Sequence, residues 1–173
     1  MGIPNTACAP ERSAASQSRD RPDVYVAASW REVERAKQVA ERLRREGLKV
    51  WAFWEEHPEP LARDLEAWEA GFPDGPPPDA LGDRLWRAKL DCLLAIREAG
   101  IVVLVEPAGN DAHNEAGFAL GQDVPVVRLG RGRPGLMTFD APVAEDLDAL
   151  VLDVGALLGR PALPRELREG GPA

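Results

Sequence analysis

Cysteine, histidine and long apolar runs are scarce in this sequence. Its 173 residues include two cysteines, Cys8 and Cys92, and two histidines. Two cysteines exclude a disulfide framework, and a four-ligand structural metal site would need more Cys and His than the chain has. No apolar run approaches the roughly 18 residues that span a membrane, and the first twenty residues lack an apolar stretch of signal-peptide length. We therefore expect a cytoplasmic protein without a membrane partner, a metal or another cofactor.

Basic residues are fewer than acidic ones. Lys and Arg number 21 against 29 Asp and Glu, which gives a formal net charge of −8. Because binding to duplex nucleic acid depends on a concentrated positive field, this balance excludes duplex nucleic acid as a main partner. Hydrophobic residues make up 45% of the chain, enough for one packed core, and the length favours a single domain.

Composition divides the chain into a domain with two flanking segments. Residues 1–21 are rich in Ser, Ala, Pro and Arg without periodicity, which predicts a flexible leader, and 160–173 predicts a flexible tail. The domain then covers 22–159. Within it, the Pro-rich stretch 55–80 interrupts the pattern, and a long insertion in a small domain is more often a functional lid than scaffold.

Short apolar runs alternate with amphipathic segments along the domain. This order predicts an α/β fold, namely a small doubly wound, flavodoxin-like parallel sheet of four or five strands with helices on both faces. The expected strands are 24–28, 48–54, 101–105 and 124–129, and the expected helices are 30–46, 83–99, 112–120 and 143–158.

The fold class also predicts where a ligand binds. In open parallel sheets, ligands bind beyond the carboxyl ends of the strands, at the point where the winding direction reverses. In a flavodoxin-like order, strands 24–28 and 101–105 flank that point. Their exit loops are Ser29-Trp30 and 107–115, and both are rich in polar or aromatic residues. We therefore expect the site between these two loops.

Glu115 is the candidate reactive group in the second loop. If a helix begins at Ala112, Glu115 falls in its first turn, where the partial positive charge of the helix end favours the ionised carboxylate. An ionised carboxylate directed at a sugar carbon is what nucleophilic glycosyl chemistry requires. The alternative is that Glu115 only complements the helix dipole, worth about 0.3–1 kcal/mol.

Three segments together resemble a known enzyme family. VYVAASWR, the aspartate near the end of the third helix and PAGNDAHNEAGFALGQDVPV are similar to the nucleoside 2-deoxyribosyltransferase-like family, above all to a phage and bacterial branch with AxSWR and HxEAG motifs. The resemblance covers 24–129, except for the Pro-rich insertion, which has no counterpart in the family. It implies that Glu115 attacks C1′ of a nucleoside or nucleotide and displaces the base, after which a second base or water resolves the glycosyl-enzyme. Relatives often form dimers or rings, so a homo-oligomer is one implication.

The resemblance implies roles for two more residues. Asp91 matches an aspartate that contacts or protonates the departing base, which would require a carboxyl buried near Glu115 so that it keeps its proton. The alternative for Asp91 is a solvated helix carboxylate. Tyr25 matches a strand tyrosine that approaches the nucleophile, although most strand tyrosines are core residues.

The remaining candidates lie in the two exit loops. Ser29 could bind the sugar and Trp30 could stack on the base, or the first could cap a helix and the second only pack. Asn110, Asp111 and Asn114 could hold ribose hydroxyls, with helix capping as the alternative for Asp111. As an added acid, Asp111 would disfavour a substrate phosphate and favour an uncharged nucleoside or a cationic leaving group.

The two histidines have different expected roles. His113 is a site-lining candidate that could carry protons near neutral pH. It lies two residues from Glu115, and residues two apart on a helix point to different sides, so we expect no direct pairing between them. His57 lies among prolines and glutamates and is expected to be a solvated loop residue.

Three other functions stay open at this stage. One is a hydrolase of NAD that resembles Toll/interleukin-1-receptor domains, which share a flavodoxin-like core and a key glutamate; release of nicotinamide would identify it. Another is a non-catalytic nucleotide-binding or signalling module that binds ligand but releases no base. The third is an interaction domain that docks a protein through its Trp-rich segment 51–86.

Overall fold

Five parallel strands form a single sheet. The computed structural model describes residues 21–57, 79–133, 135 and 137–160, with the side chains of 79–81 left out. The strand order in the sheet is β2-β1-β3-β4-β5, and every pairing is parallel. This order confirms the predicted doubly wound α/β fold. The strands are β1 (Val24–Ala28), β2 (Val50–Ala52), β3 (Ile101–Val105), β4 (Val126–Leu129) and β5 (Val143–Ala144).

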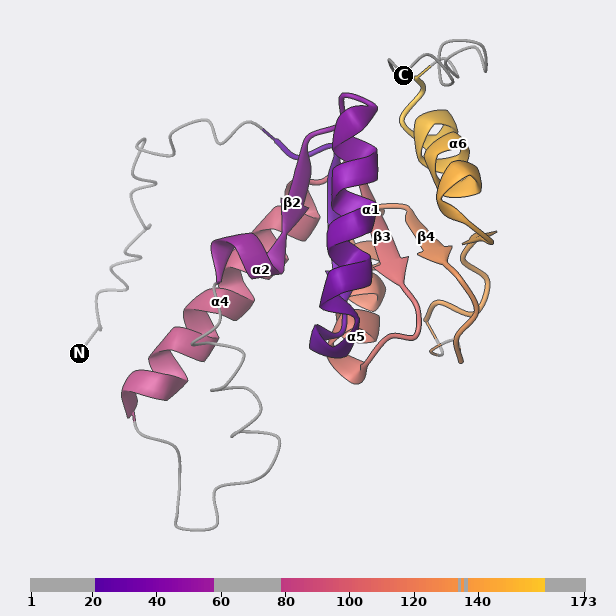
Figure 1. Cartoon of the computed structure of the whole chain (residues 1–173). Coiled ribbons are helices and arrows are strands. Elements are labelled where there is room, and N and C mark those ends of the chain that lie inside the picture. The colour runs from indigo at the N-terminus through magenta and orange to yellow at the C-terminus, as the bar shows by residue number, and fades with distance from the viewer. Residues whose placement is uncertain (1–20, 58–78, 134, 136, 161–173) are drawn as a thin grey trace, which may run out of the picture.

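Helices cover both faces of this sheet. Figure 1 shows α1 and α6 on the near face and α4 and α5 behind the sheet. The helices are the 3₁₀ turn η1 (Trp30–Glu32), α1 (Val33–Arg45), α2 (Phe53–Glu56), α4 (Asp79–Glu98), α5 (Asn110–Leu120) and α6 (Leu147–Leu157). Each face has its own buried apolar cluster, as expected for a parallel sheet buried on both sides.

Alternation along the central strands decides which side chains face which helices. Val24 and Val26 of β1 belong to the cluster under α1 and α6, whereas Tyr25 and Ala27 belong to the cluster under α4 and α5. All five residues of β3 are fully buried and alternate in the same way. The period of two along a strand therefore directs Tyr25 toward α4 and α5.

Several element boundaries differ from the sequence expectations. β2 begins at Val50 instead of 48, β4 at Val126 instead of 124, α4 at Asp79 instead of 83 and α5 at Asn110 instead of 112. The second strand ends at Ala52 instead of Trp54, because Phe53 begins the helical turn α2. The last helix begins at Leu147 instead of residue 143. Asp146 caps it by accepting a hydrogen bond from the Ala149 amide at 2.8 Å, and residues 143–144 pair with β4 as the fifth strand.

Most of the expected leader, insertion and tail lies outside the described residues. Of 1–21 only Arg21 is described, of 55–80 only 55–57 and 79–80, and of 160–173 only Arg160. The domain division thus stays a prediction. Among the described residues, no helix is both long enough and apolar enough to cross a membrane.

Candidate active site

The two predicted exit loops lie side by side. β1 and β3 are neighbours in register, with Ala28 opposite Val105, so the chain leaves both strands at the same edge of the sheet. A Cβ atom built on Gly109 would lie 3.8 Å from Oγ of Ser29, and so the loops are in near contact. Ser29 also caps η1 by accepting a hydrogen bond from the Arg31 amide at 3.3 Å. The predicted meeting of these loops is confirmed.

Glu115 lies on α5, the helix that follows the second loop, but not in the first turn of that helix. α5 begins at Asn110 with Gly109 as its N-cap, which makes Glu115 the sixth residue of the helix. Asp111 is the acidic residue of the first turn and lies inside the helix, so its expected capping role is wrong. The helix-dipole argument for an ionised Glu115 is therefore wrong as well, because that effect fades beyond the first turn.

Burial, and not the helix end, has the largest effect on the pKa of the Glu115 carboxyl. Removal of the carboxyl from water raises its pKa from 4.5 to about 7, and the negative charge of Asp111 one helical turn away adds to the rise. Hydrogen bonding to the Tyr25 hydroxyl and the Cys92 thiol acts in the opposite direction and lowers the pKa. Near neutral pH, Glu115 is thus a carboxyl that populates both its protonated and its ionised form.

Tyr25 and Cys92 complete the immediate surroundings of Glu115. Both side chains are buried, and burial followed by the charge of Glu115 raises the pKa of each above its ordinary value. The Tyr25 hydroxyl has no hydrogen-bond partner of good geometry among the described residues, so its contacts with Glu115 and Cys92 are loose in this structure. Its ring stacks on Trp51 at 4.8 Å between ring centroids, which holds it as a core residue too.

A row of ring contacts begins at Trp30, after β1, and continues through Phe53 to His57. Trp30, directly after Ser29, makes an edge-to-face contact with Phe53 at 5.3 Å between ring centroids. Phe53 in turn contacts the imidazole of His57 at 5.0 Å. The sequence allowed Trp30 either to stack on a base or to pack. It packs here on one side while remaining partly exposed.

Asp91 faces His57. Oδ2 of Asp91 lies 3.7 Å from Nε2 of His57, and the Asp91 side chain is 42% exposed. This exposure favours the alternative that the sequence left open for Asp91, a solvated helix carboxylate. The His57 side chain is only 16% exposed, so the expectation of a solvated loop residue is wrong. His57, in the described part of the insertion, thus lies next to Asp91, the helix residue to which the resemblance assigns a role.

A second polar cluster lies beside the first. Glu106 follows β3 and Arg128 lies in β4, and both are almost completely buried. The Arg128 guanidinium donates to Oε1 of Glu106 from Nε at 3.0 Å and from Nη2 at 2.8 Å. Nε2 of His113 lies 3.9 Å from the other carboxylate oxygen. His113 thus faces Glu106, in agreement with its predicted failure to pair with Glu115.

Glu106 ties the loop that leads into α5 to the sheet. Its Oε2 accepts a hydrogen bond from the Ala108 amide at 2.9 Å, and its backbone carbonyl accepts one from Nη1 of Arg35 on α1. Arg128 also donates to the carbonyl of Gly132 at 3.1 Å. The loops after β3 and β4 are therefore anchored to one buried ion pair, and α1 is bonded to the first of these loops. The arrangement fixes the path of the chain toward Glu115.

The other candidates lie at the surface of α5. Asn110, Asp111 and Asn114 are exposed, and Asp111 is close enough to Glu115 to influence its charge. Among the described residues, no group of three or more His, Cys, Asp or Glu side chains is arranged to hold a metal ion.

Sequence reasoning missed several members of the site. Cys92 was considered only as a disulfide partner, and Glu106 and Arg128 only as parts of a loop and a strand. The available signal was positional: Cys92 follows Asp91 on the helix, and a charged residue at the end of an apolar strand is buried when it faces another element. If the alternation of β3 is continued one residue past Val105, Glu106 falls on the face of the sheet that α5 covers.

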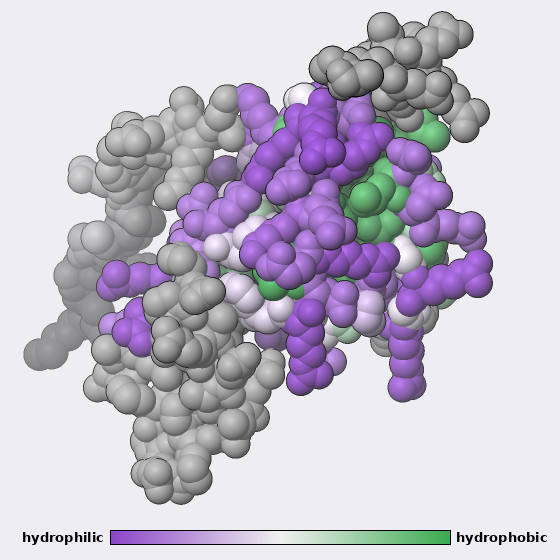
Figure 2. Space-filling view, viewed as in Figure 1, coloured by the Kyte–Doolittle hydropathy of each residue, from purple (hydrophilic) through white to green (hydrophobic). Residues whose placement is uncertain are grey.

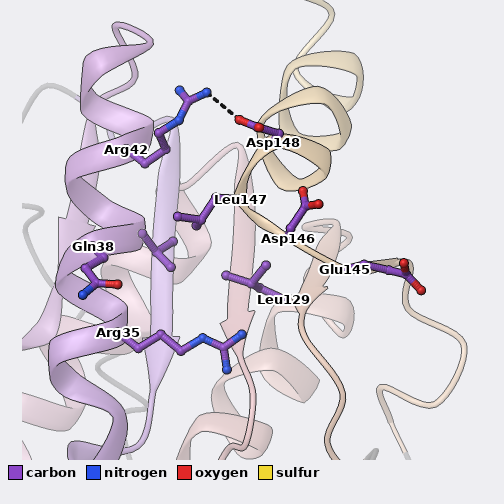
Figure 3. A pocket seen from close by; sticks show the side chains of 9 residues that line it. Arg35, Gln38, Arg42, Leu129, Glu145, Asp146, Leu147 and Asp148 are labelled. Atoms are coloured by element: carbon purple, nitrogen blue, oxygen red, sulfur yellow. Dashed lines mark hydrogen bonds and ion pairs between the residues drawn. The ribbon is translucent and has the colours of Figure 1, made fainter.

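A groove of about 560 Å³ lies away from Glu115, between α1 and α6. Figure 3 shows Arg35, Gln38 and Arg42 on one side of it and Glu145, Asp146 and Asp148 on the other, with Arg42 paired to Asp148. The floor is apolar, as the green surface beside α1 in Figure 2 indicates. Its carboxylates are exposed, in contrast to Glu115 on the opposite face. We favour the Glu115 side because burial raises the pKa of the carboxyl there, as is common at functional sites.

Comparison with known proteins gives a similarity in structure. No protein-family model matches the sequence, and no curated protein is significantly similar to it. In structure, the chain is similar to the 2-deoxyribosyltransferase of the psychrotolerant bacterium Bacillus psychrosaccharolyticus, a biocatalyst for the synthesis of antiviral and antitumoral nucleosides. The sequences are 20% identical, the TM-score is 0.50, and the similarity covers 81% of this chain and 98% of that one. The chain therefore has a fold similar to that of a 2-deoxyribosyltransferase.

Proposed function

We propose that this protein cleaves the N-glycosidic bond of a nucleoside and that Glu115 is the nucleophile. The single observation that carries the proposal is the environment of Glu115. Glu115 is partly buried on α5, and its carboxyl lies next to the hydroxyl of Tyr25 and the thiol of Cys92. The similarity in fold to a 2-deoxyribosyltransferase supports the same class of reaction.

The proposed reaction has two steps. An oxygen of the Glu115 carboxylate forms a bond to C1′ while the C1′–N bond breaks and its electron pair leaves with the base. The departing base takes up a proton from solvent water, and Asp91, the carboxyl that the resemblance implicates, contacts this base. In the second step, water or a second base attacks C1′, the bond between C1′ and Glu115 breaks, and the attacking group loses its proton to solvent. Water gives hydrolysis, and a second base gives transfer.

The electrostatics around Glu115 suit this cycle. A carboxyl with a pKa of about 7 is ionised in a large fraction of molecules at neutral pH, and the donors Tyr25 and Cys92 stabilise that form. Desolvation makes the carboxylate more reactive than one in water, because fixed dipoles replace its hydration shell.

Charge around the site favours an uncharged nucleoside over a nucleotide. Glu115, Asp111 and Asp91 supply three carboxyls near the proposed reaction centre. A 5′-phosphate would be repelled by this group, whereas the sugar hydroxyls of a nucleoside can donate hydrogen bonds to carboxylates. The exposed Asp111 and Asn114 and the Oγ of Ser29 are the proposed sugar contacts, with Asn110 and His113 lining the same edge.

A base-release assay tests the proposal. The full chain would be incubated with ribo- and deoxyribonucleosides, their 5′-monophosphates and NAD, with and without a second free base, and the products separated by liquid chromatography. We expect wild type to release base from nucleosides and Glu115→Gln to reduce the rate by at least about a thousandfold, as for loss of a nucleophile. Gln38→Ala, in the groove between α1 and α6, is the matched control and should keep the wild-type rate.

Each other outcome has a defined meaning. Release of nicotinamide from NAD, with nucleosides untouched, would replace the proposal by the NAD hydrolase. Silence across the panel, with ligand binding still detectable, would favour the non-catalytic module. Unchanged turnover in Glu115→Gln together with a loss in Gln38→Ala would move the reaction to the other face of the sheet.

A further inference from the structure

One face of α4 carries large apolar side chains that are exposed. Trp86, Leu90 and Leu94 are 57%, 39% and 46% exposed. They recur every four residues, so they form a continuous stripe on one side of the helix. The buried side chains of Ala88 and Cys92 lie two positions from Leu90, on the opposite side of the helix. The stripe therefore points away from the core.

The first half of α4 is exposed as well. Among its described side chains, those of 82–87, none is buried, and Ala88 is the first that is. Figure 1 shows the first turns of α4 beyond the edge of the sheet. Helices in proteins gain most of their stability from an apolar face that packs on another element. A contiguous exposed apolar stripe on such a helix therefore indicates an interaction surface.

Opposite charges lie at the two ends of the stripe. Asp83 precedes Leu90 by seven residues, and Arg97 follows it by seven. Seven residues are about two turns of helix, so both charges lie on the side of the stripe. Trp86 and Leu94 likewise lie four residues before and after Leu90. The stripe thus has apolar side chains at equal distances from Leu90, and charges of opposite sign at equal distances beyond them.

We propose that this stripe is an interface between two copies of the chain, with their α4 helices packed antiparallel about a two-fold axis at Leu90. A two-fold axis pairs a surface patch with the same patch of the second copy. Trp86 of each copy then packs on Leu94 of the other, and the two Leu90 side chains meet at the axis. Asp83 of each copy faces Arg97 of the other, which gives one ion pair at each end.

The charge pattern favours a second copy, in the antiparallel orientation. Parallel helices in register would bring Asp83 next to Asp83 and Arg97 next to Arg97, and such contacts between like charges are unfavourable. An apolar centre that includes a tryptophan, with charges at the rim, is typical of protein interfaces. The apolar contacts would supply most of the affinity, and the exposed ion pairs would mainly determine orientation and register.

Sedimentation equilibrium of the full chain tests the interface. We expect wild type to associate reversibly to a mass of at least two chains. Leu90→Asp places two carboxylates at the axis and should weaken the association at least about a hundredfold. Leu152→Asp is the matched control, because Leu152 is also an exposed helical leucine but lies on α6. It should keep the wild-type dissociation constant. Circular dichroism verifies that both variants fold.

Charge reversal tests the antiparallel pairing separately. Asp83→Arg and Arg97→Asp should each weaken the association at least about threefold, because each creates two contacts between like charges in a dimer. The double variant should return to within about twofold of wild type, because both pairs are restored with their signs exchanged. Positions 83 and 97 lie about 21 Å apart along one helix, so a rescue within a single chain is excluded.

Three results would overturn the proposal. The first is a wild type that is monomeric at every concentration, which would leave a different chain as the occupant of the stripe. The second is an association that Leu90→Asp does not weaken. The third is a double charge reversal that fails to restore the association lost in the folded single variants. The inference goes beyond the proposed function, and none of these results depends on base release.

Discussion

The buried carboxylate of Glu106 accepts two hydrogen bonds from the guanidinium of Arg128, across the carboxyl ends of β3 and β4. The side chains are 1% and 6% exposed. Because Glu106 also holds the Ala108 amide, this pair connects the sheet to the loop that carries the chain into α5. The pair therefore holds this loop in position, in addition to contributing to the free energy of unfolding.

Removal of one partner should be strongly destabilising. Arg128→Met leaves the Glu106 charge buried without compensation, and such a change costs about 3–5 kcal/mol. The double variant Glu106→Gln with Arg128→Met should lose less, because no buried charge remains and the Gln oxygen can still accept from Ala108. Urea unfolding of wild type, the two single variants and the double variant measures the coupling. Additive losses would contradict a direct interaction.

Gly132 should not tolerate a side chain. A Cβ atom there would lie 2.2 Å from Oε2 and 2.5 Å from Cδ of Glu106, a carboxylate that Arg128 and Ala108 hold in place. We expect Gly132→Ala to lower the free energy of unfolding by about 1–3 kcal/mol. Gly82→Ala is the matched control, since a Cβ atom at this helical position meets nothing within 4 Å. It should be neutral or stabilising by about 0.5–1 kcal/mol. Equal effects of the two variants would contradict the clash.

The core of the fold could be predicted because each central strand is an uninterrupted apolar run. Ile101–Val105 is buried at every residue. A strand that helices cover on both faces needs apolar side chains at every position, and its sequence is therefore a continuous apolar run. Parallel topology then determines that Ser29 and Gly109 lie at one edge. The prediction that the two exit loops meet followed from the order of the elements, and the close approach of Gly109 to Ser29 confirms it.

The chemistry at that edge was harder to predict because it depends on contacts between distant residues. His57 and Asp91 are 34 positions apart, and nothing local to either one indicates that they face each other. The start of α5 was misplaced because Asp111 is a better N-cap by composition than Gly109. That error of two residues reversed the expected electrostatics of Glu115, from a charge favoured by a helix end to one opposed by burial.

The raised pKa of Glu115 should make wild type less stable at high pH than a neutral variant. Its carboxyl has a pKa of about 7 in the folded chain against 4.5 for the ordinary value. Below pH 4.5 the carboxyl is protonated in both the folded and the unfolded chain, so its burial does not lower the free energy of unfolding through ionisation. Between 4.5 and 7 the unfolded chain releases the proton more readily, so stability is lost as the pH rises. The loss levels off above 7, at on the order of 3 kcal/mol.

Glu115→Gln measures this penalty. We expect the variant to be more stable than wild type at pH 8, by on the order of 2–3 kcal/mol, and the difference to vanish toward pH 4.5. Urea unfolding at pH 4.5, 6, 7 and 8 provides the comparison, with Glu41→Gln on the exposed face of α1 as the control that should show no such trend. A difference that is independent of pH would mean that Glu115 is not desolvated.

Tyr25→Phe should shift the pH dependence of base release to higher pH. The hydroxyl of Tyr25 is a donor that lowers the pKa of Glu115, so its removal lets the pKa rise further above 7. A hydrogen bond to a charged group is worth about 1.5–3 kcal/mol, and the loose contact here corresponds to the low end, or about one pH unit. The ring remains and keeps its stacking on Trp51, so the fold should be unaffected. At pH 7 the variant should be slower by several-fold, and it should approach the wild-type rate near pH 9, where Glu115 is ionised in both proteins. A profile lowered equally at every pH would show that the hydroxyl acts on the transition state or the substrate and not through the charge of Glu115.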